Sequence, residues 1–270
     1  MVRYDRYFLI AYQTSVGVYS TSSSLMVRRL QKSLNDGIAG LVLSPSQDKH
    51  LYVARFSGLI ELWDWTEGLE VNQWRTFSKV YSIVATSRLL HSKLQDLIIT
   101  VDKKADGPWL LSAPNLGTSE SAITDIKTLL TYQQPLSFVK VLDSGRNIIA
   151  TSGSQLILGT PQSSDVTNLL HLDYTWRIID CPEWIASVDV RTRPVDGRNR
   201  PTQAAKHSQV SKFDIVIGGL KGAIYIYEDL LRSLTSREKR GNAETITSRQ
   251  LHWHRNAVAA VKWSFDGESS

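Results

Sequence analysis

The segment Leu51–Trp65, LYVARFSGLIELWDW, constrains the fold of this 270-residue chain more than any other part of it. It contains two short runs in which apolar residues alternate with others, the period expected of β-strands. Ser57 and Gly58 separate the runs, and a glycine supplies the positive φ that a tight hairpin turn requires. A Trp-Asp pair, Trp63 and Asp64, closes the second run. Such a hairpin cannot bury both faces alone, so we expect several similar units packed side by side.

Similar strand patterns recur along the chain, and no long apolar stripe with the helical period of 3.6 residues is present. The predicted first strands of the repeats begin 42, 56, 48 and 73 positions apart. A WD repeat has roughly 40–45 residues, so the pattern predicts an all-β fold of the WD40 propeller type, built from four-stranded blades. The predicted first strands are Ile38–Ser44, Val80–Ala85, Leu136–Leu142, Trp184–Val190 and Ala257–Ser264.

Further apolar runs follow each of these strands, except the last, and are expected to form the second and third strands of the blades. Short turns such as Lys221-Gly222 join them in pairs. The predicted runs are Leu51–Phe56, Leu59–Trp65, Asp96–Val101, Trp109–Ser112, Asn147–Ser152, Gln155–Gly159, Phe213–Gly218 and Ala223–Tyr227.

The repeat pattern is incomplete at both ends of the sequence. The runs Tyr7–Tyr12 and Val16–Tyr19 resemble the second and third strands of a blade that lacks its first strand. The chain closes at Ser264–Gly267, in the turn after a predicted first strand. We therefore expect residues 1–270 to form a single N-terminal propeller domain with about five blades, part of a ring of about seven in the intact protein.

Composition limits the functional classes. Cys181 is the only cysteine, which excludes an intramolecular disulfide and a cysteine-cluster metal site. The sequence contains no Asn-x-Ser/Thr sequon and no recognisable signal peptide. No apolar run approaches the roughly 18 residues that a membrane-spanning helix needs. These features predict a soluble intracellular protein with no membrane partner.

Positive charge is concentrated in one region. Residues 191–255 contain 13 lysines and arginines against 6 acidic residues, whereas residues 1–190 contain 17 against 18. A turn-rich segment, Arg191–Lys212, is predicted to be a basic loop insertion in one blade, and Arg232–Arg240 is a second basic stretch. Clustered cations release counterions on meeting RNA, so these segments are candidates for contacting RNA or an acidic protein, with a solvated loop as the alternative. The candidate binding residues are Arg191, Arg193, Arg198, Arg200, Lys206, Lys212, Arg232, Arg237, Lys239 and Arg240.

The sequence does not bring together groups suited to catalysis or metal binding. Cys181 has no histidine partner placed by spacing, and Glu61 and Asp64 should point to opposite faces of one strand. His252 and His254 would point the same way from a strand, but no third metal ligand accompanies them. We expect no enzyme activity, no cofactor, no metal and no small-molecule substrate. The eight tryptophans are expected to pack within and between blades rather than to stack on RNA, because basic residues do not alternate with them.

Four segments together give a more specific resemblance. They are Leu251–Gly267 (LHWHRNAVAAVKWSFDG), Tyr7–Thr21 (YFLIAYQTSVGVYST), Gly58–Gly68 (GLIELWDWTEG) and Gly218–Asp229 (GGLKGAIYIYED). Together they resemble the WD-repeat protein seventy-five family, known in yeast as Utp seventeen. The resemblance covers most of the chain, and its distinctive parts are the His-Trp-His segment and the run of the first blade.

This resemblance implies a non-catalytic scaffold subunit of the UtpA (t-UTP) subcomplex of the small-subunit processome. Members of the family are nucleolar, and they support the transcription and early processing of pre-rRNA during biogenesis of the small ribosomal subunit. The implied partners are the other UtpA subunits and pre-rRNA, which is contacted directly or through the complex.

The sequence departs from the usual WD pattern at several positions. Ser57 and Lys221 stand where an aspartate is usual in the hairpin turn, and Tyr227 stands where a tryptophan is usual. We therefore expect blades held mostly by apolar packing. A WD-repeat interaction module of another intracellular complex, such as a ubiquitin-ligase receptor or a vesicle coat, is the alternative, because a fold alone does not decide a function.

Overall fold

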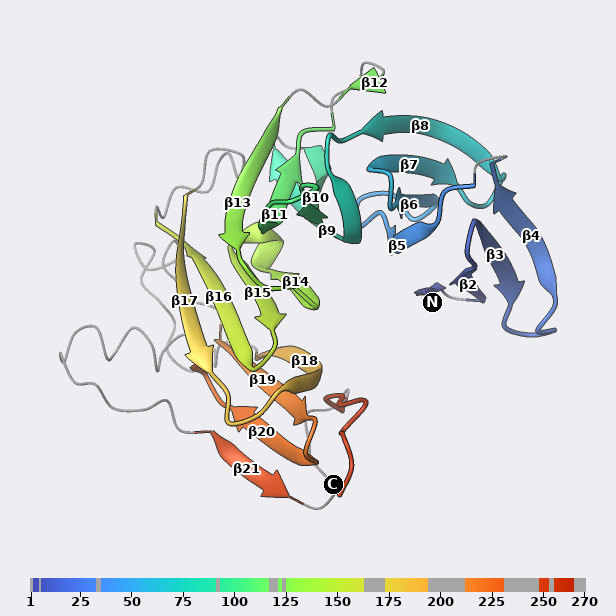
Figure 1. The fold of residues 1–270 in the computed structure, drawn as a ribbon. Helices are drawn as coiled ribbons and strands as arrows, with labels where there is room; N and C mark the ends of the chain where they lie inside the picture. The colour runs from blue at the N-terminus through green and yellow to red at the C-terminus, as the bar shows by residue number, and fades with distance from the viewer. Residues whose placement is uncertain are drawn as a thin grey trace, which may run out of the picture. The chain divides into compact units, whose positions relative to one another are not determined.

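A computed structural model describes residues 2–4, 6–32, 35–90, 93–116, 121–122, 125–162, 173–193, 212–230, 248–252 and 255–264. Every element with described bounds is a β-strand, apart from the 3₁₀ turn η1 at Asp143–Gly145 (Figure 1). The predicted all-β class is therefore confirmed. In the described part of the chain, no helix is both long and apolar enough to cross a membrane. The chain divides into two compact units, Met1–Ile148 with Thr160–Thr175 and Ile149–Gly159 with Trp176–Ser270.

The strands form five sheets, in each of which consecutive strands are hydrogen-bonded neighbours. Four sheets have four strands, and the second has a fifth, β12, which runs parallel to β8. The first sheet contains β1 (Val2–Tyr4), β2 (Tyr7–Ala11), β3 (Ser15–Ser20) and β4 (Met26–Gln31). The second contains β5 (Ile38–Leu43), β6 (His50–Arg55), β7 (Leu59–Asp64), β8 (Leu69–Arg75) and β12 (Ser121–Ala122). The third contains β9 (Lys79–Leu90), β10 (Lys93–Lys103), β11 (Trp109–Pro114) and β13 (Ile126–Tyr132).

The two remaining sheets have the same chain-order connectivity. The fourth contains β14 (Phe138–Leu142), β15 (Asn147–Ser152), β16 (Gln155–Pro161) and β17 (Tyr174–Asp180). The fifth contains β18 (Ile185–Arg193), β19 (Lys212–Gly219), β20 (Ala223–Tyr227) and β21 (Arg249–His252). The expectation of about five strand units is met by these five sheets.

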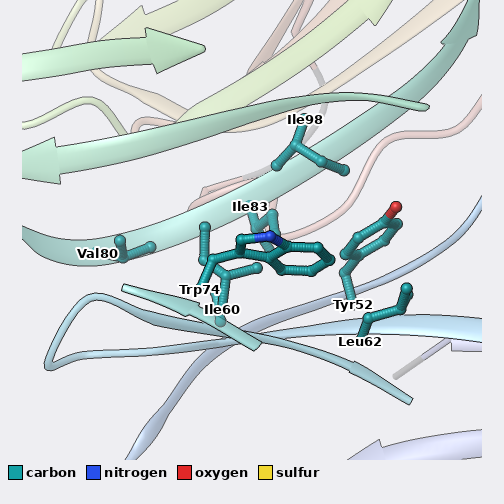
Figure 2. Close-up of a cluster of buried hydrophobic side chains, with 8 residues drawn as sticks. Tyr52, Ile60, Leu62, Trp74, Val80, Ile83 and Ile98 are labelled. Carbon is teal, nitrogen blue, oxygen red and sulfur yellow. The ribbon is translucent and has the colours of Figure 1, made fainter. Parts of the chain in front are cut away.

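The second sheet is buried on both of its faces. Along β6, Leu51 and Val53 pack in one apolar cluster with residues of the first sheet, including Leu9 and Val16. The intervening Tyr52 and Ala54 point to the other face and pack with residues of the third sheet. Figure 2 shows this second cluster, formed by Tyr52, Ile60, Leu62, Trp74, Val80, Ile83 and Ile98. Burial on both faces explains why β6 and β7 are almost continuously apolar.

The first strands of neighbouring sheets lie next to each other within the first compact unit. β1 contacts β5, β5 contacts β9, and β9 contacts β14. Sheets that stack in chain order with their first strands together are the arrangement that four-stranded repeats need in order to bury their faces against one another.

The hairpin turn at Ser57-Gly58 forms as the sequence predicts. Gly58 has φ +91°, and a Cβ there would lie 2.5 Å from the Ser78 carbonyl oxygen and the Thr76 Oγ1. The turn at Gly222, with φ +95°, connects β19 and β20 in the same way. At the end of β7, the Asp64 carboxylate accepts the Thr66 N–H and Oγ1–H, which closes the turn that follows.

Three expectations about strands and tryptophans are wrong. The first sheet does have a first strand, because Val2–Tyr4 pairs with β2. The segment Ala257–Ser264 is not a strand, since no described strand pairs with it and only isolated bonds hold it, such as Val258 N–H to the Gly219 carbonyl oxygen at 3.0 Å. Trp184 is 65% exposed rather than packed, because it lies in the turn before β18.

Side-chain carboxylates also support the two hairpins that lack the usual aspartate. At Ser57, the Asp36 carboxylate accepts both the backbone N–H, at 3.2 Å, and the hydroxyl. At Lys221, the buried Glu183 carboxylate accepts the backbone N–H, and it also accepts the Tyr225 hydroxyl at 3.0 Å. Carboxylates from elsewhere in the chain therefore take the place of the missing aspartate. The expectation that the polar contacts are lost is wrong at these two turns.

Candidate nucleic-acid interface

The basic segment predicted as a loop is partly strand. β18 continues through Arg193, and β19 begins at Lys212, which lies directly opposite Arg193 in the sheet register. The connection between these strands is therefore 194–211, shorter than the predicted Arg191–Lys212. Arg198, Arg200 and Lys206 lie outside the described residues, as do Arg232, Arg237, Lys239 and Arg240, so their part in binding stays a prediction.

Two of the candidate arginines bind an internal carboxylate. Asp214 has a fully buried side chain, and its Oδ2 accepts a hydrogen bond from Arg191 Nε at 2.9 Å. Arg193 donates to both Asp214 oxygens, and the Asp229 N–H donates to Oδ1 at 2.9 Å. Arg191 also lies over the Trp263 ring, 3.9 Å from its centroid.

This cluster is a structural one. Burial alone would raise the pKa of Asp214, but hydrogen bonds from Arg193, the Asp229 N–H and Arg191 outweigh burial and hold the pKa below its usual value. An ionised Asp214 neutralises the charge of one of its two arginines, and both guanidiniums use some of their N–H donors in hydrogen bonds to it. Arg191 and Arg193 are therefore poorer candidates for binding RNA than the sequence suggests.

A different set of basic and aromatic residues is brought together by the register of the third sheet. Lys79 of β9 lies opposite Lys103 of β10, Lys103 lies opposite Trp109 of β11, and Trp109 lies opposite Tyr132 of β13. Residues directly opposite in antiparallel strands point to the same face of the sheet. These four residues therefore form one row across the sheet, which we call the Lys–Trp row.

Further aromatic residues extend the Lys–Trp row. The Tyr81 ring lies 4.6 Å from the Trp109 ring, and Phe56, in the turn between β6 and β7, packs edge-on against Tyr81 at 6.0 Å. Lys103 Nζ lies 5.4 Å from the Trp109 centroid. Phe56 and Tyr81 are 44% and 37% exposed, so the surface is open to solvent.

The turn beside the Lys–Trp row carries one exposed charge of each sign, so the net positive charge of the surface comes from Lys79 and Lys103. Lys104 follows Lys103 and is exposed, and Asp106 is the exposed acid of the same turn. Asp102 is buried, and burial raises its pKa although the Ser112 and Thr100 hydroxyls oppose the shift. A basic surface with exposed aromatic rings is the combination that proteins use to hold single-stranded nucleic acid, through phosphate contacts and base stacking.

Sequence reasoning missed this surface. Basic residues do not alternate with the tryptophans along the sequence, but the sheet register places Lys103 beside Trp109. The four members of the Lys–Trp row are spread over 54 sequence positions, from Lys79 to Tyr132. β-bulges at Val101/Asp102 and Leu111/Ser112 shift the register, so counting along the strands would not have aligned the row. The signal that could have found it is that Lys79 comes just before the predicted run Val80–Ala85, Lys103 two residues after Asp96–Val101, and Trp109 at the start of Trp109–Ser112.

The residues weighed for chemistry have structural surroundings. Cys181 is buried, and burial raises the pKa of its thiol, partly offset by the Tyr227 hydroxyl. Glu61 forms a buried ion pair with Arg55, with the Arg55 Nε 2.9 Å from Oε1. His252 lies exposed in β21, whereas His254 lies outside the described residues. Within the described ranges, no group of three or more His, Cys, Asp or Glu side chains is placed to hold a metal ion.

Comparison with known proteins does not assign the chain to a family. No protein-family model matches it, and no curated protein matches it.

Proposed function

We propose that this chain is a non-catalytic scaffold subunit of a ribonucleoprotein assembly that contacts single-stranded RNA through the Lys–Trp row. The observation that carries the proposal is the alignment of Lys79, Lys103, Trp109 and Tyr132 on one face of the third sheet. The resemblance of the sequence to the Utp seventeen family supports a specific assembly, the UtpA subcomplex of the small-subunit processome, with pre-rRNA as the RNA and the nucleolus as the location.

The fold supports a docking role. We propose that the five sheets are consecutive blades of a WD40-type propeller and that the intact protein completes a ring of about seven blades. The antiparallel four-stranded order of the sheets, and the adjacent first strands β1, β5, β9 and β14 within the first compact unit, support this proposal. Propellers expose many turns and edges on which other proteins can dock, and this suits a scaffold.

The RNA contact can be tested with the whole protein and a labelled single-stranded 12-mer of uridine, by fluorescence anisotropy. Changing Trp109→Ala removes a stacking surface, and base stacking on an aromatic side chain contributes about 1–3 kcal/mol per base. The expected loss of affinity is therefore between about fivefold and a hundredfold. The double change Lys79→Ser with Lys103→Ser removes two phosphate contacts, which lowers the dependence of log K on log salt by about 1.4.

A matched control uses two exposed lysines of the same compact unit, Lys49 and Lys93, which lie outside the Lys–Trp row. The double change Lys49→Ser with Lys93→Ser gives the same net charge but should leave the affinity and salt dependence close to those of the parent. Equal losses in both double variants would mean that binding depends on net charge alone, and the proposed surface would be rejected.

The assembly itself can be identified by affinity purification of the intact protein followed by mass spectrometry and RNA sequencing. The proposal predicts the other UtpA subunits and pre-rRNA among the partners. Ubiquitin-ligase or vesicle-coat subunits without pre-rRNA would instead establish the alternative WD-repeat module, and would overturn the assignment to the processome.

A further inference from the structure

A pocket of about 440 Å³ opens between the second and third sheets. Its floor is the end of the apolar cluster in Figure 2, formed by Tyr52, Leu62 and Trp74. Val71 of β8 and Leu94 of β10 line its mouth and are 50% and 60% exposed. The pocket lies within the first compact unit and is separate from the Lys–Trp row. Its size suits one side chain or a small ligand.

A single carboxylate, that of Asp96, lines this pocket. Its Oδ2 accepts the Ser44 hydroxyl at 2.5 Å and the Tyr52 hydroxyl at 3.0 Å, and its Oδ1 accepts the Ser46 N–H at 3.0 Å. Burial, followed by the charge of Asp96 and the hydrogen bond to it, raises the pKa of Tyr52, so Tyr52 stays a neutral donor. The carboxylate is therefore fixed in position by three neutral groups.

No cation among the described residues forms an ion pair with Asp96, although His50 lines the same pocket. Arg88 is close in the sheet, but it lies opposite Gln95 and so points to the same face as Gln95. Because neighbours along a strand point to opposite faces, Arg88 and Asp96 are on opposite faces of the sheet. A half-buried carboxylate held by neutral donors beside aromatic rings is suited to a cation, which gains from both the charge and the ring faces.

The strand edge beside the pocket can hold an extended chain. β12 already pairs in parallel with the outer edge of β8 at Trp74 and Arg75. Nearer the pocket, no described strand pairs with this edge of β8, although the Gln73 N–H is bonded to the Asn72 side chain at 2.8 Å and is not available to a peptide. Leu69 and Val71 on the same strand are exposed and apolar. A peptide lying along this edge would place a side chain at the mouth of the pocket.

We propose that this pocket binds a lysine or arginine side chain from an extended segment of a partner protein, with Asp96 as the counter-charge. The aliphatic stem of the side chain would lie between Val71 and Leu94, and the cationic end would reach the free lone pair of Asp96 Oδ1. This inference does not depend on the proposed RNA contact, which involves other residues.

The test uses the full chain and four small probes: the N-acetyl, N′-methylamide derivatives of lysine, arginine, norleucine and glutamate. Norleucine has the aliphatic chain of lysine without the amine. Binding is followed by NMR through the indole N–H signal of Trp74, which detects millimolar affinities. From the shifts of this signal, we expect the affinity for lysine and arginine to be at least tenfold higher than the affinity for norleucine. Glutamate should not bind. Equal binding of lysine and norleucine, or no shift by either cation at about 50 mM, would overturn the proposal.

Two variants locate the charge. Asp96→Asn keeps an acceptor for the Ser46 N–H and should reduce lysine binding to the level of norleucine. Leu94 is exposed, so Leu94→Lys breaks no buried hydrogen bond. Leu94 lies two residues before Asp96 on the same face of β10. The new ammonium group can therefore occupy the site and block the probe. The control Leu25→Lys adds the same charge at a similarly exposed site away from the pocket and from β8, and should bind as the parent does. Unchanged lysine binding by Leu94→Lys would reject the site even if Asp96→Asn fails to fold.

Discussion

At the residue scale, the structure is notable for charges buried in its sheets. Arg55 and Glu61 are 2% and 1% exposed, and they form two hydrogen bonds of 2.9 and 3.1 Å between β6 and β7. Arg55 also donates to the Asp36 carbonyl oxygen at 2.8 Å, while Glu61 accepts the Trp63 Nε1–H at 3.2 Å. The pair therefore links the second sheet to the segment that precedes it.

We predict that breaking this pair destabilises the protein strongly. Glu61→Leu leaves a buried guanidinium without its counter-charge and should lower the free energy of unfolding by about 3–5 kcal/mol. Arg55→Met leaves the Glu61 carboxylate with Lys32, at 3.8 Å, as its remaining cation, so its cost should be smaller. The double variant buries neither charge and should be less destabilised than the sum of the two by about 0.5–3 kcal/mol. Urea unfolding followed by circular dichroism measures all three values.

The control is the ion pair Lys127–Asp173, in which the lysine is 22% exposed and the carboxylate is 77% exposed. Asp173→Asn should change the free energy of unfolding by less than about 1 kcal/mol. If the two single variants in the buried pair cost no more than this control, Arg55 and Glu61 do not support the fold in the way the geometry indicates.

At the scale of elements, the sequence predicts the buried strands well and the outer ones poorly. Asn147–Ser152 and Ala223–Tyr227 have the predicted bounds, because a buried strand needs a compact apolar run ending in a turn. The outer strand of each sheet, such as β4 or β8, was not predicted. Its exposed residues show little apolar pattern, and pairing with its neighbour is what makes it a strand.

The candidate interface was harder to predict than the strands. The basic loop was identified from composition, but the commitment of Arg191 and Arg193 to Asp214 depends on which residue lies across the hairpin. The Lys–Trp row depends on three strand registers at once, and a one-residue slip in any of them would send a side chain to the other face. Sequence periodicity indicates which residues share a face, but it does not show where a bulge shifts the residues that lie opposite one another.

The second sheet gives the prediction that belongs to this scale. Leu51 and Ile60 are fully buried, Leu51 toward the first sheet and Ile60 toward the third. Changing each to Ala should lower the free energy of unfolding by about 2–5 kcal/mol, since both faces are packed. Leu69→Ala, at a 65% exposed position of β8, should cost less than about 0.5 kcal/mol. A small effect at either Leu51 or Ile60 would show that one face is open, contrary to the stacking of the sheets.

At the scale of the whole molecule, charge and structure divide the basic residues into two groups. The chain carries a formal net charge of +5, and the excess comes from residues 191–255. Within that region, Arg191 and Arg193 are held by a buried carboxylate, whereas Arg198, Arg200 and Lys206 belong to the connection 194–211. If the excess charge serves RNA binding, the second group should carry it and the first should serve stability.

This division predicts opposite results for two sets of variants. Changing Arg198, Arg200 and Lys206 to Ser should weaken binding of a single-stranded RNA and lower the dependence of log K on log salt by up to about 2, because each lost phosphate contact removes about 0.7. Changing Arg191 and Arg193 to Ser should leave that salt dependence nearly unchanged, yet lower the free energy of unfolding by about 1.5–3 kcal/mol, because buried Asp214 loses its charged donors. Anisotropy titrations at several salt concentrations measure the first effect, and urea unfolding measures the second. A lower salt dependence in the Arg191 and Arg193 variant, without loss of stability, would mean that these two arginines reach RNA in solution.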